Sequence, residues 1–200
     1  MEKRDVFMVS LNSKRLEVYL EKQQQSFSDK NKLDVFVYDV FEVLNGLFFS
    51  PNNIEQINVQ MESIINKVNQ QIVLKDADKN KLIRFSDFQK EMSLYLIAVY
   101  SEYFTNPSFK RHCKSQIFQN LQPKLRDVKI TDHKSNLIEI LSPFLLAEIA
   151  YYLYIFHKNE YSAVYGLESE MEIITAIKNK KYESFNGFIV NPVPHIKVEF

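Results

Sequence analysis

The segment DVFMVSL, residues 5–11, is the part of the chain from which the fold can be inferred first. Its β-branched and aromatic residues form a continuous apolar run, which is typical of a strand buried on both faces. A second run of this kind, LDVFVYDVF, follows at 33–41, and a stretch with helical spacing at about 13–27 separates the two. Two buried strands joined by a helix predict a parallel sheet covered by helices.

The rest of the chain continues this alternation of strands and helices. Apolar periodicity predicts helices at about 52–71, 87–104, 107–121, 141–156 and 168–180, strands at 81–85 and 185–191, and a short strand or turn at 162–166. The sequence has no internal repeat, low-complexity segment or interdomain linker. We therefore expect an α/β fold with a mostly parallel sheet flanked by helices, in a single domain over residues 1–200.

Composition and charge limit the classes of protein to which the chain can belong. Hydrophobic residues make up 46% and charged residues 25%, and the formal net charge is zero, so any basic surface must be local. Cys113 is the only cysteine, which excludes an intrachain disulfide and fits a reducing compartment. The N-terminus lacks the apolar stretch of a signal peptide, and the apolar run 141–156 is too short to span a membrane. We expect a cytoplasmic protein with no membrane partner.

The sequence contains none of the common motifs for binding phosphates or metals. Neither G-x-G-x-x-G nor a Walker loop occurs, and the chain has only three glycines. The four histidines are scattered without metal-ligand spacing, and no G-x-S-x-G step indicates a hydrolase triad. We therefore expect neither a cofactor nor a metal site.

Glu148 is the residue that most needs an explanation. It stands within the apolar segment LSPFLLAEIAYYLYIF, residues 141–156, on one helical stripe with Phe144, Leu145, Tyr151 and Tyr152. Burying an unpaired, ionised carboxylate costs several kcal/mol, so a buried Glu148 would need a functional reason. An exposed position on a thin edge of the helix is the alternative.

Ser10 and Tyr165 both stand where an expected strand ends. Ligands bind beyond the carboxyl ends of the strands in parallel sheets, which makes both side chains candidates for a site. The alternatives are a turn or cap residue at Ser10 and a packed aromatic residue at Tyr165.

Basic residues gather in one segment of the chain. The segment from Phe109 to Lys134 has two acidic residues, Asp127 and Asp132. Its basic residues are Lys110, Arg111, Lys114, Lys124, Arg126, Lys129 and Lys134. Such an excess is typical either of a solvated face or of a surface that contacts phosphates, and both remain open.

Several short segments, taken in order, resemble one enzyme family. They are MVSLNS (8–13), VYDVF (37–41), IRFSDF (83–88), LYLIAVYSEYF (94–104), NPSFKR (106–111), FLLAEIAYYL (144–153), VY (164–165) and AIKNKKYESFNGFIV (176–190). In this order and spacing they resemble the tRNA-dependent cyclodipeptide synthases, which are Rossmann-like relatives of the catalytic domains of class I aminoacyl-tRNA synthetases. The resemblance covers about residues 5 to 190.

The resemblance implies a reaction and its partners. Such enzymes take two aminoacyl-tRNAs in turn and form a cyclic dipeptide, a diketopiperazine, without ATP or metal. The first aminoacyl group would move to Ser10, and a second aminoacyl-tRNA would react to give a dipeptidyl-enzyme, which closes on its own ester. The tRNA ester is already activated, so the missing phosphate loop and triad agree with this chemistry. No DNA partner is implied, and we expect a monomer.

The resemblance also implies roles for single residues. Glu148 matches the family glutamate that holds the α-amino group of the substrate, a cation that can compensate a buried carboxylate. Tyr165 matches the tyrosine that is implied to relay a proton during cyclisation. Phe144 stands where the family has a tyrosine, so we expect Tyr151 or Tyr152 to replace that hydroxyl.

Other positions depart from the family pattern and indicate a divergent member. Met8 replaces a glycine two residues before the serine, and Gly166 follows Tyr165 where histidine or proline is typical. Ser13 stands where many members have an asparagine, with Asn12 one place early, and both are expected to contact the substrate.

The tRNA-binding residues are expected in two places. The basic helix of the family corresponds to about 54–75, where this chain has few basic residues, so the later basic cluster is expected to share the task. We expect tRNA to contact Lys67, Lys75, Lys79, Lys81, Arg84, Lys110 and Arg111.

Two alternatives predict different behaviour. Another Rossmann-like acyl or nucleotidyl transferase related to the synthetases would require a nucleotide. A non-catalytic or degenerate tRNA-binding or interaction module on the same fold would bind tRNA with a steep salt dependence but would not acylate Ser10. The sequence does not determine which amino acids are joined, although its aromatic-rich interior favours apolar ones.

Overall fold

The structure, a computed structural model, describes residues 4–9, 32–37, 81–84, 89–121, 134–166 and 169–197, and positions 59, 62, 63, 65, 66, 69 and 70. The chain divides into two compact units. The first comprises Met1–Gln89, Glu160–Ser169 and Val193–Phe200, and the second comprises Lys90–Asn159 and Glu170–Pro192. The expectation of a single domain over residues 1–200 stays a prediction.

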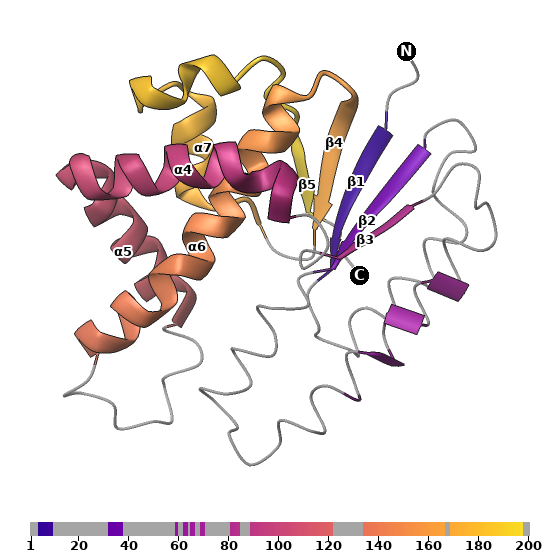
Figure 1. The fold of residues 1–200 in the computed structure, drawn as a ribbon, viewed down its shortest axis with the longest axis horizontal. Helices are drawn as coiled ribbons and strands as arrows, with labels where there is room; N and C mark the ends of the chain where they lie inside the picture. The colour runs from indigo at the N-terminus through magenta and orange to yellow at the C-terminus, as the bar shows by residue number, and fades with distance from the viewer. Residues whose placement is uncertain are drawn as a thin grey trace. The chain divides into compact units, whose positions relative to one another are not determined.

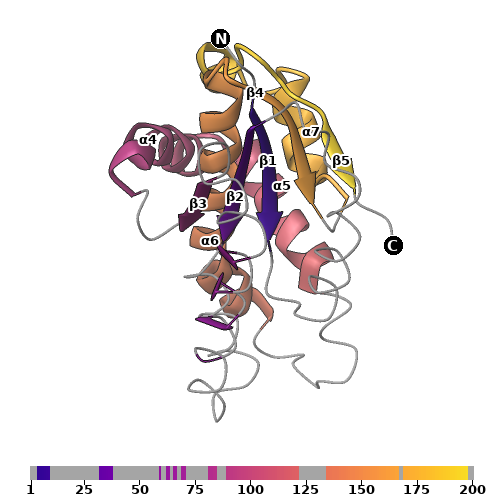
Figure 2. The same cartoon turned by 90° about the vertical axis from the view of Figure 1, so that its right-hand side faces the viewer.

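The described strands of the first unit form one parallel sheet in the order β3-β2-β1-β4-β5 (Figure 1). They are β1 (Arg4–Val9), β2 (Lys32–Val37), β3 (Lys81–Arg84), β4 (Tyr161–Gly166) and β5 (His195–Lys197). The central strand β1 lies between β2 and β4, as Figure 2 shows. The predicted α/β fold with a parallel sheet is confirmed.

The two central strands are buried because their residues are apolar on both faces. Val6 and Phe7 of β1 are 0% exposed, and so are Val35 and Phe36 of β2. A strand covered on both sides cannot alternate apolar and polar residues, which explains the uninterrupted apolar runs in the sequence.

An ion pair lies within this sheet, near the ends at which β1 and β2 begin. Nε of Arg4 donates to Oδ2 of Asp34 at 2.9 Å, and Nη2 pairs with Oδ1 of the same carboxylate. The side chains are only 13% and 5% exposed, and the Tyr161 hydroxyl of β4 donates to Oδ2 of Asp34 at 3.4 Å. The pair therefore links three strands through one carboxylate.

Helices build the second unit. They are α4 (Gln89–Thr105), α5 (Pro107–Leu121), α6 (Lys134–His157), α7 (Glu172–Lys178) and the 3-10 helix η5 (Glu183–Phe188). α5 packs along α6 and also contacts α7, and η5 packs against α6 (Figure 1). Asn106 separates α4 from α5, and its Oδ1 accepts hydrogen bonds from the backbone N–H groups of Ser108 and Phe109, at 2.9 and 3.2 Å, which caps α5.

α6 is the core helix of this unit. It begins at Lys134 and continues through Pro143, so it is longer than the helix predicted at 141–156. All residues from Ile149 to Phe156 are at most 6% exposed. Leu137–His157 has the length and apolarity to cross a membrane, but 67% of that window is buried inside the protein, as in a core helix. The buried window accounts for the apolar sequence without a lipid environment.

The prediction of a closing strand at 185–191 is wrong. Residues Glu183–Phe188 form η5. The closing strand is β5, which comes later in the chain, at His195–Lys197, and pairs with β4. Tyr182 and Phe185 are buried and Phe188 is half-buried, a spacing of three residues that matches the turn of a 3-10 helix. Val190 is 59% exposed, which no strand buried on both faces would allow.

The other predicted elements are confirmed where the structure describes them. Strands β1 to β4 and helices α4 and α5 fall in the predicted segments, and the helix predicted at 168–180 occurs as the shorter α7. The helix predicted at 52–71 is helical at Val59, Glu62, Ser63, Ile65 and Asn66. The helix predicted at 13–27 lies outside the described residues.

Candidate active site

Tyr165 stands near the carboxyl end of β4, beside the central strand. It is paired in register with Phe7 of β1, two residues before β1 ends at Val9. The sheet thus brings Tyr165 to the edge at which β1 ends, the edge where ligands bind in parallel sheets. The next residue, Ser10, lies outside the described residues, as do Asn12 and Ser13.

The environment of Tyr165 keeps its hydroxyl protonated. The side chain is half-buried, and desolvation together with the charge of Asp5 raises its pKa above the usual value of 10. Asp5 is 6% exposed and precedes Phe7 by two residues on β1, so it lies on the same face of the sheet as Phe7 and Tyr165. A hydroxyl with a raised pKa is suited to donating a hydrogen bond rather than to acting as a base.

Glu148 lies in an apolar stretch of α6. It is half-buried between Ala147 and Ile149, which are 8% and 0% exposed, and Phe144, one turn earlier, is also half-buried. Desolvation raises the pKa of the Glu148 carboxyl from 4.5 to about 7. The carboxyl is therefore desolvated rather than placed on a solvated helix edge. Its pKa lies where a group can both accept and release a proton at neutral pH.

Tyr152 shares the environment of Glu148, one turn later on α6. It is 3% exposed, and burial, the charge of Glu148 and the charge of Glu170 raise its pKa well above 10. Tyr151 is 0% exposed, and its ring stacks on Tyr154 with centroids 6.3 Å apart and planes 19° apart. Of the two tyrosines expected to replace the missing hydroxyl at position 144, Tyr152 is the one influenced by the charge of Glu148.

Sequence analysis did not identify Glu170 and Lys178. The ammonium group of Lys178 is paired with Oε1 of Glu170, and the two side chains are 15% and 18% exposed. Lys178 Nζ also lies 5.5 Å from the ring centroid of Phe156, two turns after Glu148 on α6. No sequence spacing relates this pair to α6, because the contact depends on how the segment 169–178 folds back onto that helix.

The expected site residues fall into both units. Tyr165 belongs to the first unit, whereas Glu148 and Tyr152 belong to the second. The structure therefore defines two sets of polar groups: a protonated phenol at the sheet edge, and a carboxyl of raised pKa beside a buried tyrosine.

The basic residues expected at tRNA are only partly described. Lys67, Lys75 and Lys79 lie outside the described residues. Lys81 is exposed at the start of β3, and Arg84 at its end makes two contacts of 3.2 and 3.3 Å with Glu62. Lys110 and Arg111 stand near the start of α5, where Arg111 is exposed and Lys110 half-buried.

Neither the Cys113 thiol nor a metal cluster offers a further candidate site among the described residues. Cys113 is 0% exposed, and desolvation raises its pKa to about 12, so its thiol is not activated as a nucleophile. Over the ranges that the structure describes, no group of three or more His, Cys, Asp and Glu side chains could hold a metal ion.

Comparison with solved structures identifies proteins of the same fold. The chain is similar to the structure of a CDPS, a cyclodipeptide synthase, from Staphylococcus haemolyticus, with a TM-score of 0.70 and 21% identity over 100% of this chain and 91% of that chain. It is also similar to a CDPS from Fluoribacter dumoffii, with a TM-score of 0.66 and 13% identity over 96% of this chain and 87% of that chain. No family model and no curated protein matches the sequence. Both likenesses cover nearly all of this chain, and they show that it has the Rossmann-like fold of these cyclodipeptide synthase structures.

Proposed function

We propose that the chain is a cyclodipeptide synthase, an aminoacyltransferase that joins the aminoacyl groups of two aminoacyl-tRNAs into a diketopiperazine. The observation that carries the proposal is the desolvated Glu148 carboxyl, with a pKa of about 7, in a protein of this fold. Aminoacyl-tRNA is made in the cytoplasm and is already activated as an ester, so the reaction requires neither a cofactor nor a metal. We expect the enzyme to act there as a monomer.

Ser10 is the nucleophile in this proposal. Its hydroxyl attacks the ester carbonyl of the first aminoacyl-tRNA, the ribose hydroxyl leaves with the serine proton, and the aminoacyl group remains as an ester on Ser10. The amine of this group attacks the ester carbonyl of the second aminoacyl-tRNA, the ribose hydroxyl of that tRNA leaves with the amine proton, and a dipeptide remains bound to Ser10. The terminal amine then attacks the Ser10 ester, which closes the ring and frees the serine.

Glu148 binds the α-amino group in this proposal. An α-amino group has a pKa of about 8, within roughly one unit of that of Glu148, which is about 7. A proton can therefore pass from the ammonium to the carboxylate at little cost, which leaves the amine free to attack. The ammonium in turn compensates the charge of a carboxylate that has lost much of its hydration.

Tyr152 supplies the hydroxyl that Phe144 lacks. A protonated phenol can donate a hydrogen bond to a carboxylate and accept one from an ammonium group at the same time. Tyr152 follows Glu148 by one turn of α6, and the charge of Glu148 contributes to raising the pKa of its hydroxyl, which supports a joint role of the two groups at one substrate amine.

Tyr165 acts as the proton relay at the carboxyl end of β1. Its raised pKa keeps the phenol protonated, so it can hand a proton to a leaving oxygen and regain one from the attacking amine.

The test is mass spectrometry of the culture medium from a bacterial host that expresses the protein. A cyclic dipeptide is expected from the parent and from Ser101→Ala, a matched change of an exposed serine on α4, but not from Ser10→Ala. Near-full product from Ser10→Ala would remove the covalent mechanism. The detected dipeptide would also identify the amino acids, which we expect to be apolar.

The second candidate is a tRNA-binding module that has lost catalysis, and Phe144 favours it. The family has a tyrosine at this position, and its replacement by phenylalanine removes a hydrogen bond to the substrate amine. The half-buried Phe144 side chain has no polar atom that could make this bond. Soluble parent protein that binds tRNA but yields neither a cyclic dipeptide nor an acylated Ser10 would support this candidate.

A further inference from the structure

We propose that the second unit carries a surface that binds the sugar-phosphate backbone of tRNA, made of Lys110, Arg111, Lys114, Lys180 and Lys181. We name this surface the basic ridge. The identity of the RNA rests on the proposed function, whereas the surface itself rests on the contacts described below. The ridge lies on α5 and on the turn after α7.

α5 contributes three cations from one short segment. Lys110, Arg111 and Lys114 lie within two turns of the helix start, and α5 contains no acidic residue. Lys110 and Lys114 are one turn apart and therefore share a face, while Arg111 is exposed and the Lys114 side chain is 36% exposed. Arg111 presents a planar fork of donors that suits a phosphate group.

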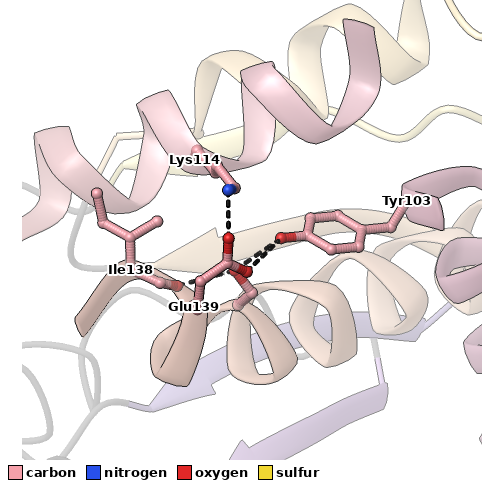
Figure 3. A network of polar contacts seen from close by, with 5 residues as sticks. Tyr103, Lys114, Ile138 and Glu139 are labelled. Carbon is pink, nitrogen blue, oxygen red and sulfur yellow. Dashed lines mark hydrogen bonds and ion pairs between the residues drawn. The ribbon is translucent and has the colours of Figure 1, made fainter. Parts of the chain in front are cut away.

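The two α5 lysines are held in place by neighbouring helices, and Figure 3 shows the contacts around Lys114. Lys114 Nζ is paired with Oε1 of Glu139 on α6, and the Tyr103 hydroxyl of α4 lies 3.4 Å from Oε2 of Glu139 and 3.1 Å from Oγ of Ser142. Lys110 Nζ lies 5.1 Å from the ring centroid of Tyr103. Two long side chains are thereby ordered in advance, so they lose less rotamer freedom when they contact a ligand.

Lys180 occupies a backbone position that favours glycine. The N–H of Lys180 donates to the carbonyl of Ile177 at 2.8 Å, and that of Lys181 donates to the carbonyl of Ala176 at 3.0 Å, which is the Schellman pattern at the end of α7. Lys180 has a φ of 57°, and it is the one non-glycine residue with positive φ among those described. A side chain that strains the backbone and still points into solvent suggests a use for its charge.

His112 joins the turn after α7 to α5. Its Nδ1 lies 2.7 Å from the hydroxyl of Tyr182. Tyr182 is the residue that follows Lys181 in the chain. Lys181 Nζ lies 5.9 Å from the ring centroid of Tyr182, so Tyr182 lies between Lys181 and His112 of α5. The charge of Lys181 accordingly contributes, after desolvation, to lowering the pKa of His112. The cations of the two segments therefore belong to one surface.

The acidic residues around the ridge do not cancel its charge. Glu139 is engaged with Lys114, Glu172 acts on His112 with a sign opposite to that of Lys181, and Glu183 begins η5. Glu102, whose charge acts on Tyr182, is a fourth carboxylate near the ridge. Five cations against these four carboxylates leave the ridge with a small net positive charge.

The rings of Tyr103 and Tyr182, next to the ridge, are 4% and 3% exposed, so bases cannot stack on these two rings. Phe104, whose ring centroid lies 5.5 Å from that of Tyr103, is 73% exposed. Contact with phosphates is independent of sequence, which suits an enzyme that must accept two different tRNAs.

The experiment measures binding of fluorescently labelled, unacylated bulk bacterial tRNA to the full chain between 50 and 200 mM NaCl. Lys180→Gly/Lys181→Gln removes two charges and preserves the turn, and it should lower affinity about tenfold or more and reduce the slope of log K against log salt by about 2. Lys90→Gln is the matched control, because Lys90 lies in the first turn of α4 and the helical rise separates it from Asn106 by about 24 Å. This control should leave affinity and slope unchanged.

Single Lys180→Gly gives a sharper test. Glycine adopts the left-handed backbone without strain, so the melting temperature should rise. The affinity for tRNA should fall at the same time, because the charge is lost. If Lys180 had no part in binding, the affinity would not change.

Unchanged tRNA binding in both Lys180→Gly/Lys181→Gln and Arg111→Gln would overturn the ridge, and an equal loss in Lys90→Gln would do the same. Product formation is measured separately, so neither outcome decides the reaction. If only the ridge variants lose tRNA binding and the parent forms no cyclic dipeptide, the basic ridge is supported and the proposed synthase activity is contradicted.

Discussion

Tyr152 follows Glu148 by one turn of α6, and burial together with the charges of Glu148 and Glu170 raises the pKa of its hydroxyl well above 10. The same desolvation raises the pKa of Glu148 to about 7. A carboxyl that gains and loses its proton near neutral pH therefore stands beside a phenol that keeps its proton.

Tyr152→Phe should lower kcat/KM by about 10- to 100-fold, which corresponds to the loss of one hydrogen bond to a charged group. Phe144→Tyr added to that variant should recover part of the loss, because it returns a hydroxyl one turn on the other side of Glu148. Steady-state assays of cyclic dipeptide formation check both, with Tyr154→Phe on the same helix as the control. Parental kcat/KM in Tyr152→Phe would show that this hydroxyl is not used.

Glu148→Gln should stabilise the fold at alkaline pH and abolish most of the activity. The raised pKa means that the native protein binds more protons than the unfolded chain between about pH 4.5 and pH 7, so its free energy of unfolding falls as pH rises through this window. Glutamine removes this loss, which amounts to up to about 3 kcal/mol above pH 7 and vanishes below pH 4.5.

Urea unfolding at a series of pH values measures this difference. Glu139→Gln is the matched control on α6, because pairing with Lys114 lowers the pKa of the exposed Glu139 carboxyl and its contribution to stability is lost as pH falls. The two variants should therefore change stability in opposite directions at pH 8. A stabilised Glu148→Gln with parental turnover would mean that Glu148 has no part in catalysis.

Tyr165→Phe should leave the sheet intact and slow the closing step, so that an acyl group accumulates on Ser10. Intact-protein mass spectrometry after incubation with aminoacyl-tRNA should detect the added mass, while cyclic dipeptide formation falls. Tyr161→Phe on the same strand is the control, because its hydroxyl contacts Asp34 and not the carboxyl end of the sheet. Equal amounts of product and no adduct in Tyr165→Phe would exclude the relay.

Arg4→Met should lower the free energy of unfolding by about 3–5 kcal/mol, because it leaves the Asp34 carboxylate buried without its cation. The double variant Arg4→Met/Asp34→Leu should recover most of this loss, since neither charge then remains inside the sheet. Denaturant unfolding of the two variants and the parent makes the comparison. Equal destabilisation by the single and the double change would show that packing, and not the unpaired charge, causes the loss.

The segments that sequence analysis predicted correctly are those whose pattern is set by burial alone. The segments 5–11 and 33–41 predicted buried parallel strands, because a strand covered on both faces is apolar at most of its positions. The exceptions Asp5 and Asp34 are themselves buried. The segment 185–191 failed because its apolar residues are spaced for η5, whose Phe185 packs on Phe109 with ring centroids 5.3 Å apart. That partner lies on another helix, so local periodicity could not identify it.

By itself, the sequence determined the α/β class, the parallel order of the early strands and the presence of a carboxylate within an apolar helix. Hydrophobic periodicity is a local property, and it suffices for those conclusions. Only the tertiary structure decided that Tyr152, and not Tyr151, shares the environment of Glu148. It alone brought Glu170 and Lys178 to α6 and joined α5 to the turn after α7. These outcomes depend on distances between groups far apart in the chain, and desolvation and charge act through those distances rather than through sequence spacing.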